Sequence, residues 1–331
     1  MARPARGRQP GDARFRLPCI VPYGAGMNPP EPPLVICLGN VVADHVFRVD
    51  DVPQPPAKAQ ARGYRLSIGG MAANAAIAAC RLGGRAAFWG RVGDDPNATL
   101  MREALEEEGV ELTGMHVVPG ARSPVSAVLV DRYGERAIMG FRGEGLGTDP
   151  SWLPLDALDG ASAFLCDPRW PEGAAVALAA AEARDLPTVL DGERSETRLL
   201  LDLVPRVRYA IFSAPGLNNF APGQRPAEAL RRAVAGGVTR MAAVTRGEDS
   251  TLWLIRGEST PREMPAFKIE ARDTTGAGDV FHGAFALAMA EGMELEAALR
   301  LASASGALRA RDGATARRPE VETFMAEFRV I

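Results

Sequence analysis

Residues 273–292, DTTGAGDVFHGAFALAMAEG, decide the fold, because small residues and an aspartate stand directly before a long apolar segment. Residues 280–290 are apolar on every helical face, which predicts an internal helix. Gly276, Ala277 and Gly278 carry little or no side chain. An anion can therefore approach the unpaired N–H groups and the positive dipole end of this helix, as phosphates do.

Asp279, in the first turn of this helix, has two interpretations. Its carboxylate would repel an incoming phosphate, yet it suits a general base that takes a proton from an attacking hydroxyl while the amides stabilise the phosphoryl group. The alternative is an N-cap beside glycines in a tight turn. His282, one turn later, is predicted to be a core histidine with its hydrogen bonds satisfied; a second base is the alternative.

Outside this stretch, short apolar segments alternate with helical ones. LVICLGN (34–40) and RAAFWGRVG (85–93) have the pattern of buried strands, and an alanine-rich segment (71–84) that of a helix. Further strand and helix patterns follow up to residue 311. The alternation predicts an α/β fold with a mainly parallel sheet covered on both faces.

Two segments break the alternation, at 45–68 and 121–142. Both contain short alternating strands and turn residues, such as DRYGER. We expect them to form one small β-sheet that acts as a lid beside the strand ends; two separate surface hairpins are the alternative. Residues 1–32 are rich in Arg, Pro and Gly and predict a disordered extension, or a start-site artefact, before a domain at 33–331.

Composition narrows the function classes. The formal net charge of -3 gives no basic field for nucleic acid or an anionic membrane, and no apolar segment is long enough for a membrane span. The 4 cysteines lack CxxC spacing and predict free thiols in a reducing cytoplasm rather than a metal site.

Polar residues follow several of the predicted strands, where open α/β sheets bind ligands. Asp44 lies just past the first strand, and Asn74 lies in the first turns of the following helix. Both side chains could hold sugar hydroxyls. Thr245 and Gly247, at the end of a later strand, predict a turn under nucleotide phosphates.

Together these motifs resemble the ribokinase-like (PfkB) family of carbohydrate kinases over residues 34–328. DTTGAGDVFHGAF resembles its C-terminal signature, and GGMAANAAIAACRLGG with GRVGDD its N-terminal one. The resemblance implies a three-layer αβα sandwich with a small β lid, a homodimer through that lid, and ATP and Mg²⁺ as cofactors. It also implies residue roles: Asp279 as base, with Gly276, Ala277 and Gly278 as anion hole; Asp44, Gly69, Gly70 and Asn74 at the sugar; Thr245, Gly247, Gly276, Gly278, Gly313 and Ala314 at ATP.

Two metal-related expectations follow from the resemblance. Many members carry an Asn-x-x-Glu motif that organises magnesium, but the corresponding residues 213–216 are SAPG. We therefore expect Mg²⁺ to bind mainly through the ATP phosphates. A monovalent cation, K⁺, is expected near Asp273.

Within the family, the chain is most similar to the sulfofructose kinase branch, through CDPRWPEGA (166–174) and related stretches. That branch phosphorylates the 1-hydroxyl of 6-deoxy-6-sulfofructose and holds the sulfonate with a lid lysine and an arginine before a tryptophan. Lys58 and Arg169 stand at those positions. The alternatives are an exposed lysine in a Pro-rich loop and an arginine with a capping or ion-pair role. Gly140 replaces a polar amide of the branch, and Arg142 would supply a third cation.

The sequence thus predicts an ATP-dependent kinase for the primary hydroxyl of a small anionic ketose, with sulfofructose as the best candidate. Fructose, ribose, fructose 6-phosphate and 2-keto-3-deoxygluconate are the alternative substrates. A nucleotide- or sugar-binding regulator without catalysis is the alternative from another class, suggested by the missing Asn-x-x-Glu motif.

Overall fold

The computed structural model describes residues 31–54, 56, 58–133 and 135–328. One compact unit spans Pro32–Ile331. The predicted disordered extension over residues 1–32 falls almost entirely outside the described residues. Among the described residues, none of the helices combines the length and apolar character needed to cross a bilayer.

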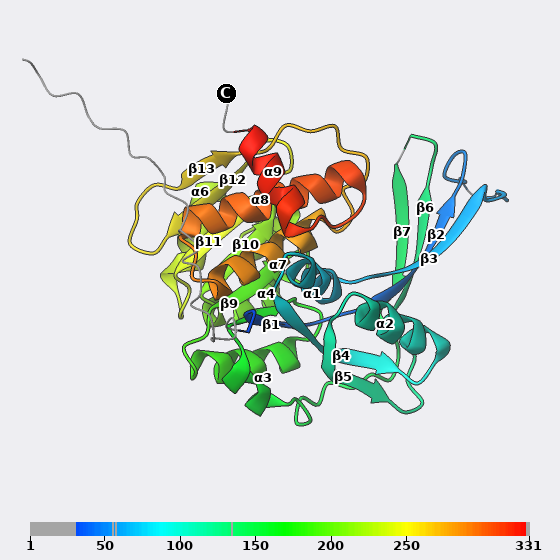
Figure 1. Cartoon of the computed structure of the whole chain (residues 1–331), viewed down its shortest axis with the longest axis horizontal. Helices are drawn as coiled ribbons and strands as arrows, with labels where there is room; N and C mark the ends of the chain where they lie inside the picture. The colour runs from blue at the N-terminus through cyan, green and yellow to red at the C-terminus, as the bar shows by residue number, and fades with distance from the viewer. Residues whose placement is uncertain (1–30, 55, 57, 134, 329–331) are drawn as a thin grey trace, which may run out of the picture. The chain divides into compact units, whose positions relative to one another are not determined.

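A large, mainly parallel sheet forms the centre of the unit (Figure 1). Its order is β13-β12-β11-β10-β9-β8-β1-β4-β5, and only the pairs β11–β12 and β12–β13 are antiparallel. The inner strands are continuously apolar because both faces are covered. The strands are β1 (Leu34–Leu38), β4 (Arg85–Gly93), β5 (Glu111–Val118), β8 (Ala163–Cys166), β9 (Thr188–Gly192), β10 (Tyr209–Ser213), β11 (Met241–Thr245), β12 (Ser250–Ile255) and β13 (Arg262–Pro265).

Helices cover both faces of this sheet, which confirms the predicted αβα sandwich. Alternate residues of β1 show the division, since Val35 and Cys37 pack into one core and Ile36 into the other. The first core is completed by α1 (Met71–Arg81), α2 (Pro96–Glu107), α7 (Ala277–Ala290), α8 (Leu295–Asp312) and α9 (Arg318–Glu327). The second is completed by α3 (Pro171–Glu182), α4 (Thr197–Leu203), α5 (Ala214–Phe220), α6 (Pro226–Ala235) and the short 3₁₀ helices η1 (Leu155–Gly160) and η2 (Val204–Arg206).

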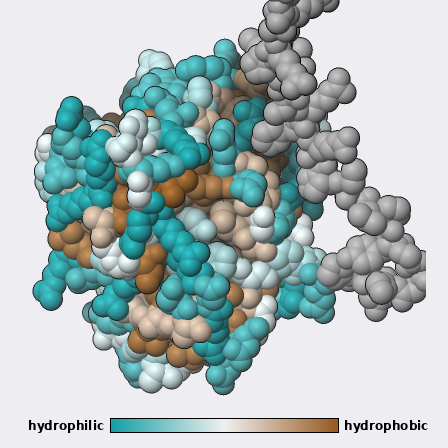
Figure 2. All heavy atoms as spheres, turned by 90° about the vertical axis from the view of Figure 1, so that its left-hand side faces the viewer, coloured by the Kyte–Doolittle hydropathy of each residue, from teal (hydrophilic) through white to brown (hydrophobic). Residues whose placement is uncertain are grey.

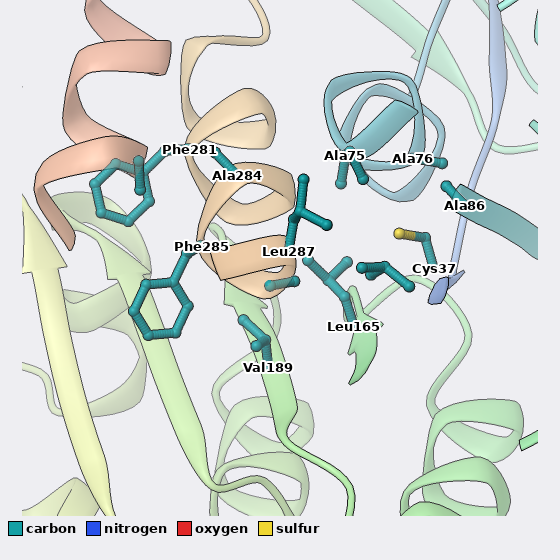
Figure 3. Packing of buried hydrophobic residues seen from close by; sticks show 14 of the residues in the cluster. Cys37, Ala75, Ala76, Ala86, Leu165, Val189, Phe281, Ala284, Phe285 and Leu287 are labelled. Carbon is teal, nitrogen blue, oxygen red and sulfur yellow. The ribbon is translucent and has the colours of Figure 1, made fainter. Parts of the chain in front are cut away.

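Helix α7 is internal, as its sequence predicts. It lies over the sheet between α1 and α8, and Phe285 and Leu287 are fully buried (Figure 3). Gly283 lets α1 approach closely, because a Cβ there would lie 2.2 Å from the Ala75 carbonyl oxygen. This close packing sets the first turns of α1 and α7 side by side.

A second, smaller sheet has the order β3-β2-β6-β7 and stands beside the large one (Figure 1). Its strands are β2 (Val42–Arg48), β3 (Gly63–Gly69), β6 (Val125–Val130) and β7 (Arg136–Phe141). The hairpins β2–β3 and β6–β7 are joined by a parallel β2–β6 pair, so they form one sheet rather than two surface hairpins. The predicted second sheet is confirmed.

Exposed large apolar side chains gather on this small sheet, where Tyr64 is 57% and Met139 is 70% exposed. Another side of the molecule shows how polar and apolar residues are distributed away from the small sheet. Figure 2 shows the side that faces left in Figure 1, and there hydrophilic and hydrophobic residues are intermingled. The exposed large apolar side chains on strands of the small sheet are Tyr64, Leu66, Ile138, Met139 and Phe141.

Candidate active site

One pocket of about 530 Å³ opens between the small sheet and the carboxyl ends of β1, β4, β8 and β9. This is the edge at which open α/β sheets bind ligands. Seven residues that the sequence singled out line it: Asp44, Gly69, Gly70, Asn74, Arg142, Arg169 and Asp279. The structure therefore brings together segments that are far apart along the chain.

Asp279 and Asn74 form one end of this pocket. Asn74 Nδ2 donates to Asp279 Oδ2 at 2.7 Å, because α1 and α7 pack closely. Burial raises the pKa of Asp279 above its usual range, and the Asn74 hydrogen bond and the nearby His282 oppose that rise. We call Asn74, Asp279 and the first turn of α7 the carboxylate end. A carboxylate whose pKa is raised in this way is a stronger proton acceptor than a free aspartate, as a general base requires.

The first turn of α7 supplies backbone donors beside this carboxylate. Gly276 adopts a left-handed conformation, φ 73°, that starts the helix without a side-chain cap. The Ala277 N–H donates to the Thr274 carbonyl at 3.2 Å. Within the described chain, the N–H groups of Gly278 and Asp279 have no acceptor. Of the predicted donors Gly276, Ala277 and Gly278, only Ala277 thus has an acceptor among the described residues, and the anion hole stays a prediction.

Asp44 faces the pocket from the small sheet. Ser126 Oγ donates to Asp44 Oδ1 at 2.5 Å, and burial raises the pKa of Asp44 above its usual range. Gly69 leaves room for this carboxylate, since a Cβ there would lie 2.3 Å from Asp44 Oδ2. Sequence reasoning missed Ser126, whose only signal was its place in a lid segment.

Arginines form the other end of the pocket: Arg91, Arg142 and Arg169 line it together with Trp170. We call these four residues the arginine end. In the described part of the chain, none of the three arginines forms an ion pair with a carboxylate. Arg91 belongs to β4 and Glu193 follows β9, three strands away in the sheet order, so the pocket extends across several strand ends.

Arg91 is the most firmly held of these arginines, and sequence reasoning missed it. Its guanidinium carbon lies 4.3 Å from the Trp170 ring centroid, and its Nη1 donates to the Gly147 carbonyl. Trp170 in turn stacks on Trp152 at 5.2 Å, so the ring that supports Arg91 is itself fixed. Burial lowers the pKa of Arg91. The only indication of Arg91 in the sequence was its position, as a basic residue near the carboxyl end of the predicted strand 85–93.

The chain also matches known proteins. Residues 32–321 match the family model of the pfkB family of carbohydrate kinases.

The chain belongs to the PfkB family of carbohydrate kinases.

Relatives within the family agree. An ATP-dependent ribose-1-phosphate kinase from Halopiger xanaduensis is 32% identical over 85% of this chain and 93% of its own length. A ribokinase from Bacillus subtilis is 27% identical over 82% and 92% of the two chains. The solved structure of a ribokinase candidate from Agrobacterium tumefaciens is 35% identical, covers 90% and 98% of the chains, and superposes with a TM-score of 0.84. The protein is an ATP-dependent sugar kinase.

Residues predicted at the nucleotide lie at the neighbouring strand ends. Thr245 ends β11, and its Oγ1 donates to the Phe212 carbonyl at 3.4 Å; Gly247 occupies the following turn, with φ 60°. Gly313 ends α8, and Ala314 lines a separate hollow of about 460 Å³ between α8 and α9. Their contacts to ATP stay a prediction for this kinase.

The segment that replaces Asn-x-x-Glu has another role here. Ser213 caps α5 by accepting from the Gly216 N–H at 3.0 Å, and its Oγ donates to Glu193 Oε1 at 3.1 Å. Glu193 lines the same pocket as Asp279, from the end of β9. The kinase therefore brings a carboxylate to this region from a different strand.

Two predicted ligand residues do not line the pocket. Lys58 is exposed in the loop between β2 and β3, outside the lining of the main pocket. Asp273 forms ion pairs with Arg136 at 2.6 Å and Arg309 at 3.8 Å, so its carboxylate already has cationic partners. The monovalent-cation site stays a prediction. No group of three or more His, Cys, Asp or Glu side chains among the described residues has a metal-binding arrangement.

Proposed function

We propose that this kinase transfers the γ-phosphoryl group of ATP to a primary hydroxyl of a small sugar whose other end is anionic. The observation that carries the proposal is the set of arginines without carboxylate partners, Arg91, Arg142 and Arg169, opposite Asp279 in one pocket. None of these guanidinium groups forms an ion pair with a described residue, although Glu172 and Asp167 act on Arg91, and Asp167 on Arg169, at longer range. Three arginines that line one pocket favour an anionic ligand. A sugar with an anion at one end and a hydroxyl at the other matches both ends of the pocket.

Two substrates have this chemistry. The resemblance to the sulfofructose kinase branch favours 6-deoxy-6-sulfofructose, with its sulfonate at C6 and its reacting hydroxyl at C1. The Halopiger xanaduensis relative is a ribose-1-phosphate kinase, and that sugar carries its phosphate at C1 and its primary hydroxyl at C5. We place sulfofructose first, because CDPRWPEGA and Arg169 support that branch.

In the proposed mechanism, Asp279 removes the proton of the attacking hydroxyl, and Asn74 orients its carboxylate. The N–H groups of Gly278 and Asp279 donate to the oxygens of the transferring phosphoryl group. Asp44, fixed by Ser126, holds another sugar hydroxyl. The small sheet covers the sugar and limits the access of water.

Mg²⁺, bound with the ATP phosphates, supplies charge neutralisation. Glu193 fits a role near this ion, because both hydrogen bonds it accepts, from Ser213 and the Arg194 N–H, involve Oε1, and Oε2 has no partner among the described residues. We propose that Glu193 replaces the glutamate of the missing motif by binding the hydration shell of Mg²⁺.

We further propose a homodimer through the small sheet. The strand register places Asp44, Ser126 and Gly140 on the pocket face, so Tyr64, Leu66 and Met139 lie on the opposite face. These three side chains are 57%, 39% and 70% exposed. Light scattering should report a dimer for the natural chain and a monomer for Met139→Lys. A cytoplasmic location is proposed from ATP use and the free thiols of Cys37, Cys80 and Cys166.

ADP release with Mg·ATP across a panel of sugars tests the function. The panel holds sulfofructose, ribose 1-phosphate, fructose 6-phosphate, fructose, ribose and 2-keto-3-deoxygluconate. We expect kcat/KM to be highest for an anionic sugar, with sulfofructose first. Turnover confined to neutral sugars would contradict the proposed substrate class and leave the kinase activity intact.

A further inference from the structure

His282 lies directly beneath the carboxylate end and is 3% exposed. Its Nδ1 is 2.6 Å from the Gly278 carbonyl oxygen and 3.3 Å from Asp191 Oδ2, and its Nε2 is 3.1 Å from the Ile211 carbonyl oxygen. The ring thus joins α7 to β9 and β10. The sequence predicted a buried histidine with satisfied hydrogen bonds, and its burial and polar contacts agree with that, but the sequence named none of the partners.

These contacts define the protonation of the ring. A backbone carbonyl oxygen can only accept, so Nδ1 must carry a proton for Gly278 and Nε2 must carry one for Ile211. A neutral imidazole has a single N–H and would leave one short contact between two acceptors. Both contacts are satisfied together only when both ring nitrogens carry protons, and Asp191, 3% exposed and 3.3 Å from Nδ1, stands where the counter-charge of such a ring would be needed.

The Gly278 carbonyl connects the His282 ring to the helix turn that is proposed to bind the transferring phosphoryl group. The Gly278 carbonyl belongs to the same peptide group as the N–H of Asp279. A carbonyl that accepts a charge-assisted hydrogen bond fixes and polarises its peptide, which makes the N–H on the other side a stronger donor. That N–H is one of the two free amides in the first turn of α7.

We propose that His282 is a positioning residue for phosphoryl transfer: held by Asp191 and Ile211, its imidazolium fixes the Gly278–Asp279 peptide so that the Asp279 N–H meets the transferring phosphoryl group. The inference rests on the proposed role of Asp279 and its helix turn. The inference adds to the residues that touch the substrate a buried pair, His282 and Asp191, that acts on the reaction without touching the substrate.

The charged groups around the pair set the expected pH behaviour. Asp191 and Glu193 face it from β9, Asp279 lies on its own helix, and Asp167 acts on Asp191 from the end of β8. Burial raises the pKa of Asp191 to about 7, with Asp279 and Glu193 adding to the rise and His282 opposing it. The imidazolium also lowers the pKa of Asp279. Without the cation, Asp279 should hold its proton to a higher pH.

Kinetics of His282→Gln test the inference. Glutamine can still donate to one carbonyl but carries no charge, so we expect kcat to fall about 10- to 100-fold, as for other residues that orient a reacting group. The KM values for ATP and sugar should change little, and the acidic limb of the kcat profile should move to higher pH. Thr239→Val is the control, because it also removes a buried side-chain hydrogen bond, to the Val204 carbonyl, at a residue outside the pocket lining. It should leave kcat and the acidic limb of the kcat profile unchanged.

Nitrogen NMR provides a test that does not require an active variant. The chain has only 3 histidines, so His45→Asn and His116→Asn assign the remaining ring signals to His282. Both ring nitrogens of His282 should carry protons at pH 7.5. A neutral tautomer there, or an unchanged kcat and acidic limb in folded His282→Gln, would overturn the inference. If Asp279→Asn remained active, the proposed role of Asp279, on which the inference rests, would fail; if the natural chain turned over none of the sugars, the proposed function itself would fail.

Discussion

The two ends of the pocket hold their charged groups in different ways. At the carboxylate end, Asn74 donates to Asp279, and His282 contacts both the Gly278 carbonyl and Asp191 beneath it, all on packed helices and strands of the large sheet. At the arginine end, Arg142 is exposed, Arg169 is half-buried, and only Arg91 is fixed, by stacking on Trp170. The proposed base is therefore held by groups packed in the core, whereas the proposed anion site depends on side chains that are held less firmly.

Asp279→Asn should have the largest effect, because it removes the proposed base from the rigid end. We expect kcat to fall by about 10³-fold or more, with the Kd for ATP nearly unchanged. Single-turnover phosphoryl transfer and ATP titration measure the two quantities. A natural chain without turnover on any sugar would favour the non-catalytic regulator instead.

Arg91→Met tests the arginine end. Loss of a charge-assisted hydrogen bond to the substrate anion should lower kcat/KM for an anionic sugar by about 10- to 100-fold. Turnover of a neutral sugar should not change. Arg300→Met is the matched control, because Arg300 also stacks on an aromatic ring, Phe267 at 5.2 Å, outside the pocket lining. Equal losses with charged and neutral sugars would show that Arg91 acts on folding instead.

Gly283→Ala and Gly140→Ala compare the rigidity of the two ends. The first places a Cβ 2.2 Å from the Ala75 carbonyl oxygen, and should destabilise the fold by about 1–3 kcal/mol and loosen the Asn74–Asp279 contact. The second meets no atom within 4 Å and should leave Tm unchanged. Thermal unfolding measures both. Similar Tm losses would contradict the proposed difference between the ends.

Asn74→Ala should give the smallest effect, a shift of the pH profile. Burial holds the pKa of Asp279 above its usual range, and the Asn74 hydrogen bond lowers it. A base must be ionised, so kcat falls as pH decreases through this pKa; without Asn74 the pKa rises and the acidic limb moves to higher pH. Rate profiles between about pH 4.5 and 8 measure the shift. Ser126→Ala, whose hydroxyl bonds Asp44 instead, should leave the limb in place.

Local patterns in the sequence determined much of this protein. Continuously apolar strands between helical segments predicted the parallel sheet, and small residues before an internal helix predicted the turn of Gly276 and Asp279. Burial and turn geometry depend on residues close in sequence, so a single chain shows them. The predicted roles of Lys58 and of the residues at ATP stay predictions.

Only the tertiary structure decided which distant residues meet. Asn74 contacts Asp279 across 205 positions, and Arg91 joins Arg142 and Arg169 through the strand order and the fold of the small sheet. His282 stands in an apolar segment, so the sequence indicated only a core residue. Its partners are a carboxylate on another strand and backbone carbonyl groups, which the neighbouring residues in the sequence do not reveal. Such contacts arise when helices pack on a sheet, and no local spacing records them.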